Sequence, residues 1–238
     1  MNLITISEAL AEQLDRLEFS SPIAHVYNPL RYAWRPHREY LSRYGASGKK
    51  VVLLGMNPGP WGMTQTGVPF GEVTVVRDWL QIVDPVDRPH GEHPKKPVLG
   101  LECRRSEVSG KRLWGLIRDR FHTPERFFRH YFVLNYCPLL FLDGCGANLT
   151  PDKLPPGERR AVSGACDQAL RRMIEYLQPE YVIGVGNFAA AQAESALQGL
   201  PVTIARILHP SPSSPAANRG WSEAALRQLA EAGVPFQP

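Results

Sequence analysis

The amino-acid sequence predicts an α/β fold, a three-layer α/β/α sandwich with a central four-stranded parallel sheet. Two observations favour it. Four short apolar runs show no clean alternation of polar and apolar residues, which indicates strands covered on both faces, as in a parallel sheet. Helical patterns lie between these runs, and strands separated by helices form layered α/β folds. Because we find no repeat, low-complexity tract or interior linker, we expect one domain over residues 1–238.

The elements follow from the local patterns in chain order. An amphipathic helix is expected at 6–19, with Ser7 as its N-cap. The four apolar runs predict strands at 50–55, 131–136, 180–186 and 202–208. Further helical patterns lie at 110–121, 157–177, 187–198 and 222–233. Each of the last three strands is thus preceded by a helix, as a parallel sheet requires.

Two segments rich in proline and glycine interrupt this pattern, at residues 84–102 and 142–159. Loops of this length in a compact domain are usually functional or mobile. For the first segment, an irregular surface excursion remains an equal alternative. The second follows directly from the end of a predicted strand, so we expect it to lie near the functional edge of the sheet.

Composition excludes several classes of protein. A net charge of +4 suits a polyanionic partner without requiring one. The four cysteines form no C-x-x-C pair, so no metal site is expected. The first residues carry acids where a signal peptide would carry a basic segment and an apolar core. No apolar run approaches the ~18 residues of a membrane span, so no membrane association is expected.

Three uncharged polar residues lie at predicted strand ends. Asn57 follows the first strand, Asn135 ends the second and His209 follows the fourth. Ligands of open α/β sheets bind beyond the carboxyl ends of the strands, so these side chains should converge. Each has an ordinary explanation when taken singly: a turn former, a cap or a buried histidine. Their order along the chain favours a common site.

The third strand runs into "GVGNFA" at 184–189, which matches the G-x-G-x-x-A dinucleotide fingerprint. That fingerprint expects an acid about 20 residues later, at the end of the next strand. Here the next strand ends in "RILHPSP", which contains no acid. A tight strand-to-helix turn therefore explains the glycines, and no nicotinamide cofactor is expected.

The expected chemistry uses neutral groups. The chain contains no nucleophile elbow, P-loop, H-E-x-x-H motif or paired carboxylates. The nearest acids to Asn57, Glu72 and Asp78, lie at or beyond the end of its motif. Such a site suits a bond that breaks mainly by departure of the leaving group, and the N-glycosidic bond of a pyrimidine nucleotide is one.

Three stretches carry a family resemblance: "GMNPGPWGMTQTGVPFGE" (55–72), "NYCPL" (135–139) and "HPSPSSPAANRGW" (209–221). They resemble the uracil-DNA glycosylase superfamily, and most closely its single-strand-selective monofunctional members. The resemblance implies a DNA repair enzyme that excises uracil and 5-substituted uracils from single- and double-stranded DNA without a cofactor. Neither active-site motif contains a lysine, so no lyase activity is expected. The alternative is a non-catalytic nucleic-acid-binding protein on the same fold.

The resemblance also implies roles for individual residues. Asn57 would hold the catalytic water and His209 would contact the departing uracil. The base pocket would be formed by Met56, Gly59, Met63, Phe70 and Asn135. Among these, Phe70 would stack on the ring and Asn135 would read its edge. Gly59 would leave open space beside C5 of the base.

The predicted DNA surface has two parts, an insertion spanning about 145–159 and the loop after His209. Its candidate residues are Cys145, Gly146, Asn148, Lys153, Arg159, Ser211, Pro212, Ser213 and Ser214. Ser213 stands where members of the family often carry a basic residue. We expect a monomer, located in the nucleus of a eukaryote or in the nucleoid-containing cytoplasm of a bacterium.

Overall fold

A parallel four-stranded sheet forms the centre of the computed structural model, which describes residues 2–238. Its strands lie in the order β3-β2-β6-β7. Their bounds are β2 Val51–Gly55, β3 Tyr131–Asn135, β6 Tyr181–Val185 and β7 Thr203–Ile207. All four predicted strands and the α/β/α fold class are confirmed, and each strand is slightly shorter than expected.

The central strand β2 explains the uninterrupted apolar runs. Every residue of β2 is buried, because β3 and β6 flank it in parallel register and helices cover both faces. The edge strand β7 differs, since Thr203 and Arg206 are exposed. Burial on both faces therefore holds for the inner strands and only in part for β7.

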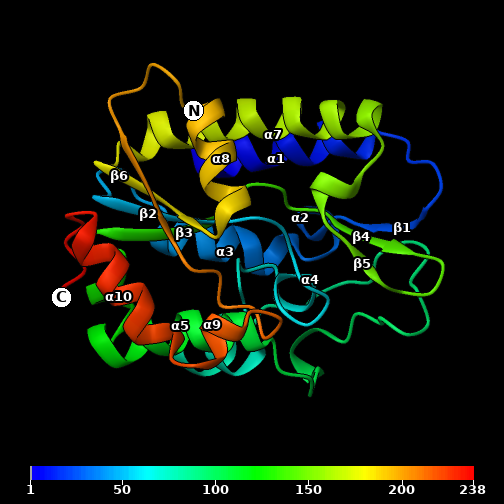
Figure 1. Cartoon of the computed structure of the whole chain (residues 1–238). Helices are drawn as coiled ribbons and strands as arrows, with labels where there is room; N and C mark the ends of the chain where they lie inside the picture. The colour runs from blue at the N-terminus through cyan, green and yellow to red at the C-terminus, as the bar shows by residue number, and fades with distance from the viewer. Residues whose placement is uncertain (1) are drawn as a thin grey trace.

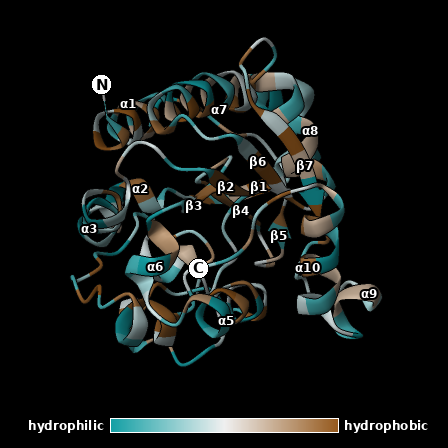
Figure 2. Ribbon diagram, turned by 90° about the vertical axis from the view of Figure 1, so that its left-hand side faces the viewer, coloured by the Kyte–Doolittle hydropathy of each residue, from teal (hydrophilic) through white to brown (hydrophobic). Residues whose placement is uncertain are grey.

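Two helical layers enclose this sheet (Figure 1). One layer contains α1 (Leu3–Asp15), α7 (Pro156–Leu177) and α8 (Asn187–Ala196). The opposite layer contains α5 (Val108–Phe121) and α10 (Trp221–Glu231). These five helices were predicted, and hydrophobic and hydrophilic residues alternate along them in Figure 2. Each of the five buries several of its apolar residues. Within residues 2–238, no helix has the length and apolar character needed to cross a membrane.

The start of α1 differs from the prediction. Its N-cap is Asn2, whose side-chain oxygen accepts a hydrogen bond from the Thr5 N–H at 3.0 Å. The Thr5 hydroxyl in turn accepts from the Asn2 N–H at 3.2 Å, which completes a capping box. Ser7 therefore lies buried inside the helix and does not cap it.

A second, antiparallel sheet was not predicted. It contains β1 (Ile23–Tyr27), β4 (Leu140–Asp143) and β5 (Asn148–Leu149), in the order β1-β4-β5. Part of the expected loop 142–159 is thus the β4–β5 hairpin, followed by the 3₁₀ turn Pro151–Lys153. In the hairpin turn, the Asp143 carboxylate accepts hydrogen bonds from the N–H groups of Cys145 and Ala147 at 2.8 and 2.9 Å.

Segment 84–102 contains one short 3₁₀ turn, Gly100–Glu102, but is firmly attached. The Tyr27 hydroxyl donates to the Lys96 carbonyl at 2.9 Å and accepts from the His93 N–H at 2.7 Å. Val98 is buried in a small cluster with residues of β1 and β4. The segment therefore lies against the second sheet and is more than an irregular surface excursion.

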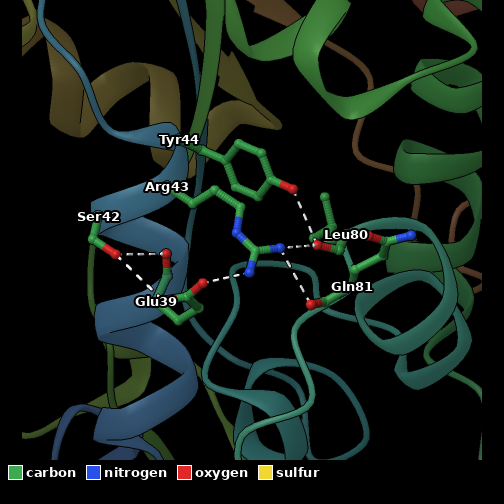
Figure 3. Close-up of polar contacts among 6 residues, drawn as sticks. All are labelled: Glu39, Ser42, Arg43, Tyr44, Leu80 and Gln81. Carbon is green, nitrogen blue, oxygen red and sulfur yellow. Dashed lines mark hydrogen bonds and ion pairs between the residues drawn. The ribbon is translucent and has the colours of Figure 1, made fainter.

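Short helices complete the fold: α2 (Pro29–Tyr32), α3 (Trp34–Tyr44), α4 (Met63–Thr66), α6 (Pro124–Phe128) and α9 (Pro215–Asn218). The end of α3 holds the chain that leaves the first motif (Figure 3). Arg43 pairs with Glu39 and donates to the carbonyls of Leu80 and Gln81 at 3.0 and 3.2 Å. The Tyr44 hydroxyl donates to the same Leu80 carbonyl at 3.0 Å.

Candidate active site

The three polar residues at the strand ends lie around one cavity. Asn57, Asn135 and His209 line a hollow of about 510 Å³ at the carboxyl edge of the parallel sheet. Met56, Gly59, Met63 and Phe70 line it as well. The order of the strands thus predicted which residues meet, because the ends of parallel strands share one edge.

Buried hydrogen bonds hold the loop that follows β2. The Gln65 amide donates to the carbonyls of Pro60 and Pro97 at 2.9 and 3.0 Å. Gln65 Oε1 accepts from the Leu99 N–H at 2.8 Å. Since Gln65 is fully buried, these bonds attach the first motif to segment 84–102.

The Asn57 amide has a defined orientation. Its Nδ2 donates to the Leu139 carbonyl at 3.1 Å, from the chain that follows β3. This contact leaves the Oδ1 lone pairs of the half-buried side chain available to the cavity. Asn57 therefore presents an acceptor that can hold a water molecule.

Phe70 and Asn135 approach each other over Gly55, the last residue of β2. A Cβ at Gly55 would lie 2.5 Å from Phe70 Cε2 and would also overlap Asn135 Oδ1. One amide hydrogen of Asn135 points to Met63 Sδ, with an N–S distance of 3.3 Å. The bare glycine thus makes room for an aromatic ring and an amide at the same wall of the cavity. Sequence reasoning missed this role of Gly55.

Phe70 has a left-handed backbone, with φ of 54°. This conformation is uncommon for a bulky residue and persists only where neighbours impose it. Trp114 Nε1 donates to the Pro69 carbonyl at 3.2 Å, and the Phe70 carbonyl lies so close to Gly110 that any Cβ there would overlap it. Helix α5 therefore fixes the backbone that carries the Phe70 ring.

His209 is held as a neutral imidazole. Its Nδ1 accepts a hydrogen bond from the Ser211 N–H at 3.1 Å, so the proton of the neutral ring lies on Nε2. Burial lowers the pKa of His209 below its ordinary value. Gly186, with φ of 96°, allows the close approach, because a Cβ there would lie 3.1 Å from His209 Cβ. The two glycines of "GVGNFA" thus serve backbone geometry, and Gly184 packs against Ala190 of α8.

Sequence reasoning missed an acid at this site. Glu107, just before α5, lines the cavity and is half-buried. Burial raises the pKa of its carboxyl, and the neighbouring backbone N–H groups of Trp61 and Ser109 oppose that rise. The expectation that the site contains only neutral groups is therefore wrong. No spacing rule could have found Glu107, which lies fifty residues after Asn57 in the chain.

Glu107 also corrects the expectation for Gly59. A Cβ at Gly59 would lie 2.6 Å from Glu107 Oε2 and 3.2 Å from its Cδ. The side of Gly59 where a side chain would point is thus occupied by a carboxylate and is not open space. The glycine permits the contact between the first motif and the residue that begins α5.

The predicted DNA residues are only partly brought together. Asn148, Ser211, Pro212 and Ser213 line the cavity with the candidate catalytic residues. Cys145 and Gly146 line a neighbouring hollow. The remaining candidates line neither hollow: Lys153 pairs with Asp152 at 3.6 Å, Arg159 donates to the Asp152 carbonyl at 3.4 Å, and Ser214 caps α9.

Across residues 2–238, no group of three or more histidine, cysteine or acidic side chains is arranged to hold a metal ion. Cys145 is the exposed cysteine of this part of the chain, and Cys103, Cys137 and Cys166 are buried. The polar side chains that line the cavity thus include the amides of Asn57 and Asn135, the imidazole of His209 and the carboxylate of Glu107. The amide of Asn148 and several hydroxyls line it as well, those of Ser106, Ser109, Thr150, Ser211 and Ser213.

Residues 42–232 match the family model described as the uracil DNA glycosylase superfamily. The chain is 53% identical over 227 residues to the single-strand selective monofunctional uracil DNA glycosylases of Bos taurus and Mus musculus. The alignments cover 94% of this chain and 84% and 81% of those proteins. The fold is similar to the crystal structure of wild-type SMUG2 from Pedobacter heparinus, with a TM-score of 0.66 at 14% identity, over 95% of this chain and 96% of that one.

Proposed function

The chain belongs to the uracil DNA glycosylase superfamily, and we infer from this membership that it is a monofunctional DNA glycosylase of base excision repair. It hydrolyses the N-glycosidic bond of uracil in DNA. One arrangement in the site supports this best: the acceptor oxygen of Asn57 and the Nε2–H of neutral His209 line the same cavity. A protein that only bound nucleic acid would not need this pair.

We propose that the cavity receives a uracil rotated out of the DNA stack, a motion that costs a few kcal/mol. Stacking on Phe70 offsets part of this cost, since base–aromatic stacking contributes roughly 1–3 kcal/mol. The Asn135 amide has a donor for uracil O4 and an acceptor for N3–H. Cytosine presents the opposite pattern, and each buried group left unpaired would cost roughly 1–3 kcal/mol.

The proposed reaction needs a positioned water and a stabilised leaving group. Asn57 Oδ1 holds the water against C1′, and the C1′–N1 bond breaks with its electron pair leaving on uracil. His209 Nε2–H donates to uracil O2, where negative charge develops, as in an oxyanion hole. The water oxygen bonds to C1′ and its proton ends on the base. The products are free uracil and an abasic site, whose backbone stays intact because neither motif contains a lysine.

The position of Glu107 suggests how the site accepts 5-substituted uracils. We propose that C5 of the base lies towards Gly59, where the Glu107 carboxylate is the neighbouring polar group. The hydroxyl of 5-hydroxymethyluracil would donate a further hydrogen bond to this carboxylate, whereas a methyl group can donate none. This explanation replaces the open space expected beside Gly59.

We also propose that residues 1–238 act as one domain and as a monomer, in the compartment that contains the DNA. The family match over 42–232 supports the single domain, since it includes most of the chain.

Release of free uracil tests the proposed function. The protein is incubated with a single-stranded oligonucleotide that contains one uracil, with EDTA present, and the free base is quantified. We expect one uracil per strand and an intact backbone until the abasic site is cleaved with alkali. A protein doubly substituted at Asn57 and His209 is the control for contaminating activity. Binding without release of uracil would favour the non-catalytic alternative.

A further inference from the structure

A second hollow of about 910 Å³ adjoins the base cavity. The two share one wall, the half-buried Trp61 of the first motif. Segment 94–105 forms one side of this second hollow, and the hairpin turn 145–147 forms the other. We call it the Trp61 groove.

The Trp61 groove is strongly basic. Its lining contains four cations, Lys95, Lys96, Arg104 and Arg105, and one acid, Glu102. Among residues 2–238, none of these four cations forms an ion pair. The lining thus carries four cations against one acid, and no ion pair within the described chain neutralises any of the four, so the groove suits an anionic ligand.

Trp61 holds two of these cations in place. Lys96 Nζ lies 5.1 Å from the centre of the indole ring, and Arg105 Cζ lies 4.5 Å from it. Both distances are those of cation–π contacts. Because each contact orders a long side chain before any ligand arrives, less conformational entropy is lost on binding.

The groove has a fixed position relative to the base cavity. The buried Gln65 joins Pro60, next to Trp61, to Pro97, next to Lys96. The β4–β5 hairpin contributes to both hollows, since Cys145–Ala147 line the groove and Asn148 lines the cavity. A ligand that continues from the cavity therefore meets a preformed basic surface.

We propose that the Trp61 groove binds the sugar-phosphate backbone of the nucleotides that flank the target uracil on one side. This inference rests on the proposed function, because it takes the cavity as the site of the uracil. Phosphates carry no sequence information, so the groove binds every sequence alike. The groove contacts only the strand that carries the uracil, and it therefore binds single-stranded substrates as well as duplexes.

The test replaces two groove cations with neutral residues of similar length, in the double variant Lys96→Gln/Arg105→Gln. Single-turnover cleavage is measured against protein concentration, which separates the half-saturating concentration from the maximal rate. We expect the half-saturating concentration to rise about tenfold at moderate salt, with an unchanged maximal rate. The logarithm of the affinity falls linearly with the logarithm of the salt concentration, and each phosphate that a cation neutralises on a single strand contributes about 0.7 to that slope. The loss of two cations should therefore make the slope shallower by about 1.4.

The matched control is Lys50→Gln/Arg129→Gln, which removes the same charge from the other end of the molecule. Both residues are exposed and lie at the amino ends of the strands. Lys50 directly precedes β2, and Arg129 lies shortly before β3. This control should leave the half-saturating concentration within about twofold of the native value. If both double variants weaken binding equally, the effect comes from net charge and the groove is not a site.

Two further substrates test whether the groove serves one side of the uracil. Each carries the uracil near one end of a short single strand, with the remaining nucleotides on its 5′ side or on its 3′ side. The groove variant should weaken binding of one substrate and spare the other. Equal weakening of both, or no weakening, would overturn the inference. If the native protein releases no uracil, the proposed function itself fails.

Cys145 provides a second measurement on the native chain. Its thiol is exposed and lines the groove. Cys103 also lines the groove but is buried, and Cys137 and Cys166 are buried elsewhere. Oligonucleotides that carry an activated disulfide on one chosen phosphate should cross-link to Cys145 by thiol–disulfide exchange, with release of the activating thiol. We expect cross-linking at phosphates on one side of the uracil. Cross-linking independent of position, or none at any position, would contradict a groove that holds the strand.

Discussion

The Ser211 N–H donates to His209 Nδ1 at 3.1 Å, and this one contact places the proton of the neutral imidazole on Nε2, in a residue that lines the cavity. A protonated ring would carry a hydrogen on Nδ1, directed at another N–H. Together with burial, which lowers the pKa of His209, the contact keeps the ring neutral. The histidine thus acts as a hydrogen-bond donor and not as a cation.

The first prediction concerns the pH dependence of this donor. Because the pKa of His209 is lowered, the single-turnover rate should stay constant as pH falls to the ordinary histidine value of about 6.5, and should decline only below it. His209→Ala should lower the rate by about 100- to 1,000-fold, the typical effect of losing one such donor. A rate that begins to fall well above pH 6.5 would contradict a neutral His209.

The second prediction concerns the water-holding amide. Asn57→Ala should lower the single-turnover rate by at least about 100-fold while DNA affinity barely changes, because the group acts in the transition state. Asn57→Asp should not restore the native rate, since a carboxylate oxygen would then face the Leu139 carbonyl that now accepts from Nδ2. Rates and affinities are measured on the same oligonucleotide. A near-native rate for Asn57→Ala would remove Asn57 from the mechanism.

The third prediction concerns Glu107. Glu107→Ala should lower kcat/KM on 5-hydroxymethyluracil more than on uracil, by roughly tenfold, the effect of losing one hydrogen bond to a charged group. Matched oligonucleotides carrying each base provide the ratio. Glu102→Ala is the control, since this exposed acid lies in the Trp61 groove and should not change the ratio. If kcat/KM falls equally on both bases, Glu107 only holds the loop that contains Gly59 in place and does not contact the 5-substituent.

The fourth prediction concerns the loop after His209. Arg112 of α5 donates to the carbonyls of Pro210 and Ser211 at 3.0 and 3.3 Å and so attaches the start of the loop to α5. Ser213, further along the loop, is exposed. Ser213→Arg should improve activity on duplex substrates more than on single strands, because it adds a cation at the edge of the cavity that can pair with a phosphate. Single-turnover kinetics on both substrates measure this. A gain of equal size on both would argue against insertion of the loop into duplex DNA.

The sequence predicted those parts of the site that depend on the main sheet. Asn57, Asn135 and His209 each lie at or after the carboxyl end of a strand that an apolar run identifies. Because the carboxyl ends of parallel strands lie at one edge of the sheet, their proximity can be predicted even when the loop conformations are unknown. Their chemical roles remain predictions, because position alone does not measure catalysis.

The rest depended on contacts between distant segments. Glu107 reaches the cavity only because α5 begins beside the first motif, and no local pattern reports that placement. The second sheet escaped prediction because β5 has only two residues and lies inside the Pro/Gly-rich stretch 142–159, which also contains the end of its partner β4. The Trp61 groove likewise forms from segment 94–105 and a hairpin turn some forty residues later in the chain.

The fifth prediction concerns acid stability. His37 of α3 is buried, and its neutral ring donates from Nδ1 to the Gly67 carbonyl at 2.7 Å, just after α4. Burial lowers the pKa of His37 from 6.5 to about 4. Between these values the unfolded chain binds more protons than the folded protein, so stability is complete above pH 6.5 and falls as pH drops towards 4. This histidine alone should account for a loss of about 3 kcal/mol across that interval.

His37→Gln removes the titrating group and keeps a side chain that can donate to Gly67. Urea unfolding at several pH values should therefore show a smaller loss of stability between pH 6.5 and 4 than in the native protein. The comparison uses the slope with pH, because the variant starts from a lower stability at neutral pH. Since Gly67 follows α4 of the first motif, single-turnover cleavage at neutral pH serves as the control for the loop. Identical slopes for the two proteins would show that the acid sensitivity arises from other groups.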